Sequence, residues 1–299
     1  MKKGDKDISN KDYIAYIDTD SLFMKMEEFL LDSGVDPEKW KILPDKQKIN
    51  YILELSRKIE EYVDKSCFEE LQQGTYNSTV EKDDFAIVFK QEIVCKAALF
   101  IKKKKYGFHV VNDEGVDKDE IDVTGLEIIR SETPTAFKVI LKKVLRFILE
   151  DKTDKEIIQF VDECKDLIKK EEPEDISSNI NINKLGKYIV DGEPIKGTPY
   201  HIKGAASYHK LLKLFNIDGY YESLIEGNKA KVVYVKSNPY NIDVVSYVKW
   251  PKEFTKNGIE PDYEKMIEKF LIKKIKILLE PQNRENILKR NNTFDMFFG

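Results

Sequence analysis

The stretch that decides the fold is YIAYIDTDSLFM, residues 13–24. Residues 13–17 and 22–24 are rich in aromatic and aliphatic side chains that favour strands. Four polar residues, Asp18-Thr19-Asp20-Ser21, separate these two segments, and Asp, Thr and Ser are typical of tight turns. The pattern predicts a β-hairpin that carries two carboxylates at its corner.

The Asp-Thr-Asp corner permits two interpretations. Asp and Thr are common in turns because they hydrogen-bond their own backbone, and a bare DTDS sequence needs no further explanation. Alternatively, two carboxylates at a rigid corner bind hard divalent cations through oxygen. Phosphoryl transfer between nucleotides uses such a corner for two Mg²⁺ ions about 4 Å apart, one at the attacking 3′-hydroxyl and one at the leaving pyrophosphate.

The composition is that of an ordinary globular protein of 299 residues, of which 41% are hydrophobic and 35% charged. No run of eighteen apolar residues occurs and the first ten residues lack a secretory signal, so we expect a cytoplasmic protein without a membrane span. Three cysteines without a CxxC pair argue against a disulfide framework and a thiolate zinc site. With a net charge of −4, nucleic-acid binding would require locally concentrated positive charge.

The first part of the chain is predicted to be rich in strands. Apolar residues every three to four positions predict an amphipathic helix over 47–72. Strands are expected over 85–94 and 97–111, with a turn at Asn112-Asp113-Glu114-Gly115 and a short strand that ends over 125–129. The composition changes near residue 128, where we place a domain boundary.

The second part is predicted to be mainly helical. Thr133 as N-cap and Pro134 at the first helical position predict a helix to about residue 150. The further predicted elements are helices over 154–170 and 205–215, strands over 231–236 and 243–249, and a long helix over 262–280. Together with the first part, these elements predict an α+β fold.

Four lysines, Lys102 to Lys105, interrupt an otherwise apolar strand. A run of charges is usually a solvated face. Successive side chains of a strand alternate, however, so the four lysines are expected to divide between both faces of a sheet. Adjacent ammonium groups repel one another unless an anion binds them, and nucleic-acid phosphates supply that anion. The run therefore indicates a nucleic-acid contact.

The segment Tyr16-Ile17-Asp18-Thr19-Asp20-Ser21 resembles the third palm motif of family B DNA polymerases, YGDTDS, with Ile17 in place of the glycine as in the T-even phage branch. The resemblance continues in the family's order along nearly the whole chain. The matching segments are Phe89-Lys90-Gln91-Glu92, Lys103-Lys104-Lys105-Tyr106, Thr124-Gly125-Leu126-Glu127, Thr133-Pro134, Tyr200-His201-Ile202-Lys203-Gly204 and Phe294-Asp295-Met296-Phe297. Each segment is weakly specific alone, but the shared order makes the resemblance strong.

The resemblance implies a metal site and a DNA-binding surface. Asp20 corresponds to the palm aspartate that coordinates two Mg²⁺ ions, Asp18 lies beside it, and Glu92 approaches the site through water. An exposed glutamate on an edge strand and a lone histidine also have purely structural explanations. The residues expected to contact the primer or the duplex product are Lys103, Lys104, Lys105, Tyr106, Lys187, His201 and Lys203.

The aromatic tail is similar to the clamp-binding end of T-even phage replicative polymerases. The residues expected to fill a hydrophobic pocket of a sliding clamp are Phe294, Met296, Phe297 and Phe298. The sequence departs from the phage pattern after Phe297, where an acidic residue and a final phenylalanine are expected. The alternative is that the tail folds back on the thumb.

Several parts of a family B active site do not occur in residues 1–299. These are the DxxSLYP palm segment, the KxxxNSxYG fingers helix and the exonuclease carboxylate motifs. A palm sheet without its neighbouring strands leaves open edges and an uncovered apolar face. The sequence is therefore expected to be either a fragment or the second piece of a polymerase encoded in two chains. For the latter we expect a partner chain that carries the exonuclease, the fingers and the remaining palm, with an interface above roughly 2,000 Å².

These observations lead to one functional hypothesis and one alternative. Residues 1–128 are expected to be the carboxy-terminal part of a palm, 129–281 a thumb and 282–299 a clamp-binding tail. With its partner, the chain would extend a primer on template DNA from deoxynucleoside triphosphates, using two Mg²⁺ ions in a site shared between chains. The alternative is a non-catalytic subunit that binds DNA and tethers a sliding clamp.

Overall fold

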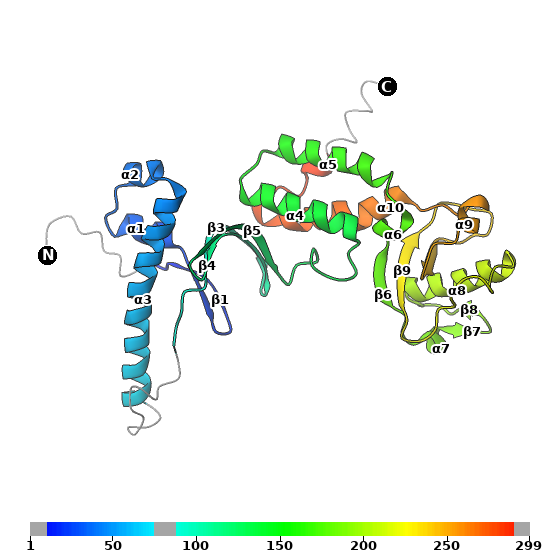
Figure 1. The fold of residues 1–299 in the computed structure, drawn as a ribbon, viewed down its shortest axis with the longest axis horizontal. Helices are drawn as coiled ribbons and strands as arrows, with labels where there is room; N and C mark the ends of the chain where they lie inside the picture. The colour runs from blue at the N-terminus through cyan, green and yellow to red at the C-terminus, as the bar shows by residue number, and fades with distance from the viewer. Residues whose placement is uncertain (1–10, 75–87, 290–299) are drawn as a thin grey trace. The chain divides into compact units, whose positions relative to one another are not determined.

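A computed structural model describes residues 11–74 and 88–289 (Figure 1). The chain divides into two compact units: unit 1 comprises Met1–Ala98 and Phe108–Asp122, and unit 2 comprises Leu99–Gly107 and Val123–Gly299. Helices alternate with antiparallel sheets, which confirms the predicted α+β class. None of the helices in the described part of the chain has the length and apolar character needed to cross a bilayer.

Unit 1 begins with the predicted hairpin. Strand β1 (Ile14–Asp18) pairs antiparallel with β2 (Ser21–Met24), and Asp18 lies opposite Ser21. The two intervening residues, Thr19 and Asp20, form the tight turn. Within the described ranges, β1 and β2 form a sheet of only two strands.

Three helices follow the hairpin: α1 (Met26–Asp32), α2 (Pro37–Ile42) and α3 (Asp45–Gly74). Helix α3, the longest in Figure 1, confirms the helix predicted from apolar periodicity, with each end within two residues of the expected one. Helices α1 and α2 were not predicted from the sequence.

The central sheet consists of β3 (Ile93–Lys102), β4 (Lys105–Asp113) and β5 (Val116–Thr124), in the order β3-β4-β5. The predicted turn at 112–115 is confirmed, and the side-chain oxygen of Asn112 accepts a hydrogen bond from the Gly115 amide at 3.0 Å. The predicted strand limits are wrong, because β3 reverses at Lys103-Lys104 and not between residues 94 and 97. Lys104 takes a φ of +60° there, a conformation that turns the chain.

Unit 2 contains a helical layer in which α4 (Thr135–Leu149) packs against α5 (Asp154–Ile168), as Figure 1 shows. Both helices confirm predictions, and α5 begins with a capping box between Thr153 and Glu156. The predicted cap of α4 is wrong, because Pro134 occupies the N-cap position and offers no side-chain hydrogen bond. The Thr133 hydroxyl instead donates to the carbonyl of Glu127 at 2.6 Å.

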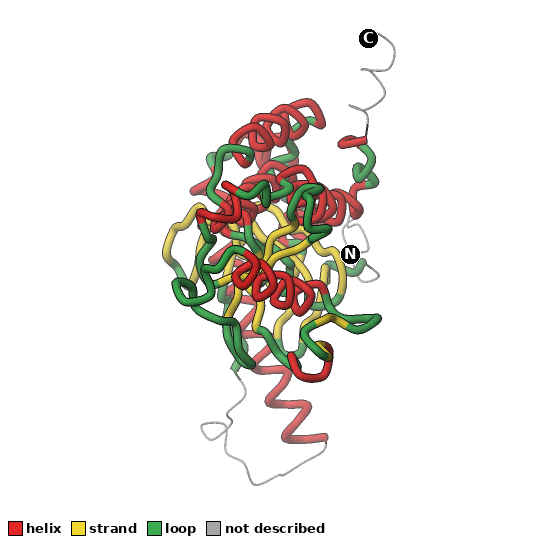
Figure 2. Tube along the Cα trace, turned by 90° about the vertical axis from the view of Figure 1, so that its right-hand side faces the viewer, coloured by secondary structure: helices red, strands yellow, loops and turns green. Residues whose placement is uncertain are grey.

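The second sheet of unit 2 has the order β10-β9-β6, with β6 (Ser178–Asn181), β9 (Lys229–Tyr234) and β10 (Val244–Tyr247). Helix α8 (Tyr200–Leu214) lies against this sheet, toward the viewer in Figure 2. It begins five residues before the predicted start. The Ser246 hydroxyl on β10 donates to the His201 carbonyl at 2.7 Å and joins the two elements.

The last long helix is continuous in the sequence but not uniform. The α-helical segments α10 (Tyr263–Ile267) and α11 (Lys273–Leu279) flank a π-helical turn at Glu268–Ile272. The helix predicted over 262–280 is thus confirmed, with an internal irregularity that periodicity did not reveal. The remaining short elements are α6 (Pro173–Ile176), α7 (Leu185–Tyr188), β7 (Ile189–Val190), β8 (Glu193–Pro194), α9 (Lys252–Lys256) and the 3₁₀ turns Glu280–Gln282 and Ile287–Lys289.

The contact between α8 and β10 gives a first prediction. A methyl group on Gly204 would lie 2.4 Å from the Ser246 hydroxyl oxygen and 2.7 Å from the Ser246 amide nitrogen. We expect Gly204→Ala to lower the free energy of unfolding by about 1–3 kcal/mol, because overpacking displaces the helix from the sheet. Chemical denaturation followed by circular dichroism measures the loss. Gly186→Ala is the control, since apart from its chain neighbours and its own helix backbone no atom lies within 4 Å of a methyl there; equal stabilities of the two variants would contradict the overpacking at Gly204.

Candidate functional site

The aspartate corner is a strained turn that exposes carboxylate oxygens. Thr19 has a φ of +58°, a region in which a β-branched residue is an outlier. Such strain costs on the order of 1–3 kcal/mol and concentrates at functional sites. Asp20 is exposed and Asp18 is half-buried, and the Thr19 hydroxyl lies 3.4 Å from Asp18 Oδ1. The turn therefore holds two carboxylates two residues apart at the end of a hairpin.

Aromatic packing anchors one face of the hairpin, and the other face is exposed. The Phe23 ring lies 6.0 Å from Tyr16 and 5.2 Å from Phe108 on β4, measured between ring centroids. On the opposite face, Ile17 and Leu22 are cross-strand partners with exposed fractions of 61% and 44%. An exposed apolar pair beside the corner is a surface that association can cover.

A third carboxylate, Glu92, is predicted to approach the aspartate corner through water. Glu92 is exposed and directly precedes β3, where its carbonyl oxygen accepts a hydrogen bond from the Glu114 amide at 2.7 Å. Across residues 11–74 and 88–289, no group of three or more His, Cys, Asp or Glu side chains is arranged to hold a metal ion. Asp18 and Asp20 offer the oxygen donors that Mg²⁺ prefers, but a complete site requires further ligands.

The lysine run forms the tip of the β3–β4 hairpin. Lys102, Lys103 and Lys104 are exposed, and Lys105 is half-buried. The expectation that the four lysines divide between two faces of one strand is wrong, because Lys103 and Lys104 are the turn itself. Both residues of the turn are exposed lysines, so the tip of the hairpin presents positive charge to the solvent.

Gly125, in the segment that follows β5, lies directly against the turn at Lys103-Lys104, which we call the lysine turn. Its φ is +64°, and a Cβ atom at this position would lie 1.9 Å from the carbonyl oxygen of Lys104. Only glycine permits this approach of two backbones. The spacing between the lysine motif and Thr124-Gly125-Leu126-Glu127 thus has a direct structural reason.

An ion pair joins the same segment to helix α11. The Lys274 ammonium lies 3.0 Å from Glu127 Oε2 and donates to the Thr133 hydroxyl at 2.9 Å. The hydrogen bond from Lys274 lowers the pKa of the Glu127 carboxyl below its usual value, and Arg130 and Lys105 add to the effect. Three cations thus surround one carboxylate.

The remaining predicted DNA-binding residues occupy different environments. Tyr106 is buried, with its ring 5.8 Å from that of Phe100. Lys203 is exposed on α8, whereas burial lowers the pKa of His201 on the same helix below its usual value. The Lys187 ammonium lies 5.4 Å from the centroid of the Tyr188 ring. The predicted clamp-binding residues Phe294, Met296, Phe297 and Phe298 lie outside the described residues.

A cation–aromatic cluster in unit 2 was missed by the sequence analysis. The rings of Tyr200 and Tyr234 stack at 5.9 Å, and the Lys269 ammonium lies 4.1 Å and 4.5 Å from their centroids. Lys265 contributes a second ammonium 4.4 Å from the Tyr234 ring. These residues come from α8, β9 and the last helix, so no local pattern reveals them.

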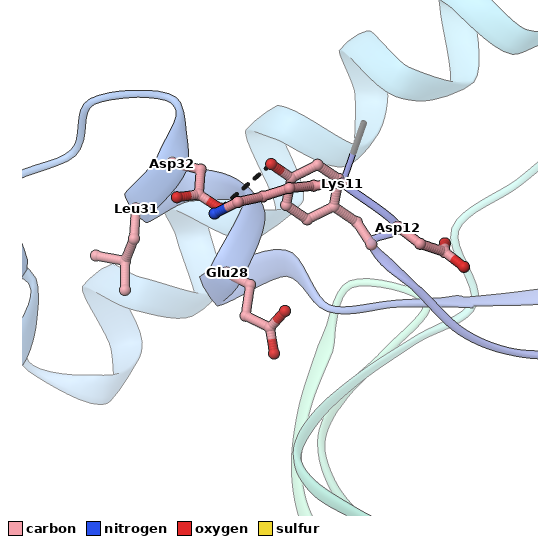
Figure 3. A pocket seen from close by; sticks show the side chains of 6 residues that line it. Lys11, Asp12, Glu28, Leu31 and Asp32 are labelled. Carbon is pink, nitrogen blue, oxygen red and sulfur yellow. Dashed lines mark hydrogen bonds and ion pairs between the residues drawn. The ribbon is translucent and has the colours of Figure 1, made fainter. Parts of the chain in front are cut away.

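A hollow on unit 1 contains none of the predicted site residues. Figure 3 shows the side chains of Lys11, Asp12, Glu28, Leu31 and Asp32 around it. Lys11 forms an ion pair with Asp32, and the Tyr13 hydroxyl donates to the same carboxylate at 3.3 Å. These contacts tie the start of β1 to α1, which gives the cluster a structural role.

The close approach at Gly125 gives a second prediction. We expect Gly125→Ala to lower the free energy of unfolding by about 2 kcal/mol or more, because the methyl group collides with the Lys104 carbonyl. Gly258→Ala is the matched control, with a φ of +78° and no atom within 4 Å of the added methyl. Denaturant titrations of both variants separate the collision from the cost of positive φ, and equal losses would refute the close approach.

The ion pair of Glu127 gives a third prediction, on pH. A carboxyl whose folded pKa is lowered stabilises the fold above its unfolded pKa of about 4.3, and this stabilisation is lost as the pH falls through the folded pKa. Lys274→Met removes the main cause of the shift. The stability of the native chain relative to this variant should therefore decrease as the pH falls from 7 to below 4.

Thermal unfolding of the native chain and the variant across this pH range measures the change. Lys273→Met, at an exposed neighbouring position, is the control. A stability difference that stays constant with pH would contradict the pairing.

Comparison with known proteins identifies the family. The family model described as DNA polymerase family B matches residues 65–282, well over half of the chain. The DNA-directed DNA polymerase of Escherichia phage RB69 is 27% identical over 205 residues, which cover 65% of this chain and 22% of the relative. That of Enterobacteria phage T4 is 19% identical over 305 aligned positions, which cover 97% of this chain and 32% of the relative. The chain thus spans less than a third of the length of these curated relatives, and it belongs to DNA polymerase family B.

Proposed function

We propose that this chain supplies the carboxy-terminal part of a DNA-directed DNA polymerase that adds deoxynucleotides to a primer 3′ end. The observation that carries the proposal is the strained turn that holds Asp18 and Asp20, in a chain of this family. In the proposed organisation, residues 1–128 contribute to the palm, 129–281 form the thumb and 282–299 form the tail.

Asp20 and Asp18 would hold two Mg²⁺ ions together with ligands from outside this chain. The ions would supply charge stabilisation for phosphoryl transfer, with activation of the 3′-hydroxyl and support of the leaving pyrophosphate. The rigid turn keeps the two carboxylates in place without reorganisation, which is the protein's contribution to such a site. Glu92 is proposed to act through water, since it does not join the corner as a third ligand.

The lysine turn would hold the primer strand. Lys103 and Lys104 are exposed at the tip of a hairpin and present positive charge to phosphates. Tyr106 is buried next to Lys105 on β4, and its ring packs with Phe100. Contacts to the duplex product would come from Lys187, His201 and Lys203.

The packing of unit 1 supports a requirement for further polypeptide. No described side chain of α3 between Asp45 and Cys67 is buried, although the helix has an apolar stripe. The buried apolar side chains of unit 1, among the described residues, are Leu30, Trp40, Val94, Phe108, Val110 and Ile121. We propose that a partner chain, which carries the exonuclease, the fingers and the remaining palm, covers the apolar stripe of α3. The interface would exceed roughly 2,000 Å².

The tail would attach the polymerase to a sliding clamp. Phe294, Met296, Phe297 and Phe298 combine aromatic and flexible apolar side chains in a polar segment. Such residues serve as anchors in peptide-binding pockets. Loss of processive synthesis, with single-nucleotide addition retained, would be the signature of this role.

A second candidate function is a non-catalytic subunit that binds DNA and tethers the clamp. The observation in its favour is that Asp18 and Asp20 lack a third clustered ligand among the described residues. This candidate retains the role of the lysine turn but makes the aspartates dispensable for synthesis.

The fourth prediction separates the two candidates. In the complex of this chain with the polypeptide that carries the fingers and the remaining palm, Asp20→Asn should lower the rate of primer extension by about a thousandfold or more, because a metal ligand loses its charge. Asp12→Asn is the control, since it makes the same chemical change at an exposed position outside the corner. Primer extension with Mg²⁺ and deoxynucleotides measures both, and full activity of the Asp20 variant would support the non-catalytic candidate.

A further inference from the structure

A mixed cluster of charges lies where the lysine turn meets helix α11. Lys105, Glu127 and Lys274 line one small hollow, which has an apolar floor that includes Leu126 and Leu278. Only 13% of the Lys274 side chain is exposed, against 39% for Glu127. The Lys274 ammonium is held by Glu127 and Thr133, so its function in this arrangement is to fix the carboxylate.

Cations besides Lys274 act on this carboxylate, namely Arg130 and Lys105. Arg130 lies 3.9 Å from Glu127 Oε1, and Gly125 joins the segment directly to the backbone of Lys104. The exposed lysines of the turn therefore belong to the same surface, in a chain whose net charge is −4. Such a local excess of cations is what a phosphodiester backbone requires.

A carboxylate in the middle of this surface needs a reason. By charge alone, Glu127 repels phosphates and weakens binding. By geometry, it pairs with Lys274 of α11 in the hollow that Lys105 also lines, and it limits the freedom of the Lys274 side chain. Ordering a side chain in advance reduces the entropy lost on binding. The two effects change the affinity for DNA in opposite directions, so a measurement of affinity separates them.

We propose that Glu127 is a positioning residue for DNA binding: it anchors the lysine turn to α11 through Lys274 and orients Lys105 toward a bound phosphodiester. This inference rests on the proposed function, in which the lysine turn holds the primer strand. It assigns a role to an acidic residue that neither the charge pattern nor the metal site explains.

The test is the affinity of the full chain for a primer–template duplex, measured by fluorescence anisotropy at several salt concentrations. Glu127→Gln should weaken binding by roughly three- to tenfold, which is the loss of about one ordered phosphate contact, and should reduce the salt slope by about one. If the carboxylate acts only by charge, its removal should tighten binding, and that result would overturn the proposal. Glu163→Gln, an exposed residue on α5, makes the same charge change outside the cluster and should have little effect.

Two variants of Lys274 separate positioning from a loss of folding. Lys274→Arg keeps the pair and should retain the native affinity, whereas Lys274→Met should weaken binding as Glu127→Gln does. Because the two residues act through one contact, the double variant should be no weaker than either single variant. Circular dichroism establishes that the variants are folded at the temperature of the assay, and additive losses would contradict the shared mechanism.

A further pair of variants distinguishes failure of this inference from failure of the proposed function. Lys103→Ala and Lys104→Ala should each weaken duplex binding by roughly threefold, because each removes a phosphate contact. If these variants bind as the native chain does, the role of the lysine turn is itself wrong. If they weaken binding and Glu127→Gln does not, only the positioning role is refuted.

Discussion

The cationic surface of unit 2 depends on the close approach of Gly125 to the backbone carbonyl of Lys104. It joins the tip of a β-hairpin to the segment that leads into α4. Since a side chain at this position would collide with the carbonyl, the contact can form only at a glycine. The ion pair between Glu127 and Lys274 then continues the connection to α11. Four exposed or half-buried lysines thereby gain a defined support, although charge repulsion favours their separation.

The two units differ in how much of their apolar surface the described residues bury. In unit 2, strand β10 is buried along its whole length, and side chains such as Phe137, Leu141 and Tyr247 are fully inaccessible. In unit 1, α3 has no buried side chain in its described part, and Ile17 and Leu22 are exposed beside the aspartate corner. An amphipathic helix obtains most of its stability from packing of its apolar face. Unit 1 is therefore the part of the molecule in which association with further polymerase residues would add most to stability.

The chemistry follows the same division. The strained turn at Thr19 places Asp18 and Asp20 on unit 1, where their oxygen atoms are suited to a hard cation but too few to enclose one. The contacts that support the cationic surface, in contrast, all lie within unit 2: Gly125 approaches Lys104, and Glu127 pairs with Lys274. In the proposed function, the lysine turn would bind a polyanion through contacts within this chain, whereas phosphoryl transfer would use further ligands besides Asp18 and Asp20.

Local sequence patterns were sufficient for the elements that periodicity, capping residues or strand propensity indicate. Helix α3 follows from its apolar periodicity, α5 from its periodicity and capping residues, and the β1–β2 hairpin from strand formers around a polar corner. The lysine turn was not predictable in this way, because Lys103 and Lys104 are not typical turn residues and the flanking apolar segments indicate one long strand.

The sequence by itself determined the α+β class and the aspartate hairpin, because propensity and periodicity act over a few residues. The order of the family motifs followed from the resemblance to family B DNA polymerases. Only the tertiary structure decided that Gly125 receives the Lys104 carbonyl, that Lys274 pairs with Glu127, and that Lys269 lies over Tyr200 and Tyr234. The physical reason is that these contacts join residues far apart in the chain. Their energies depend on distance and burial in space, which no local pattern encodes.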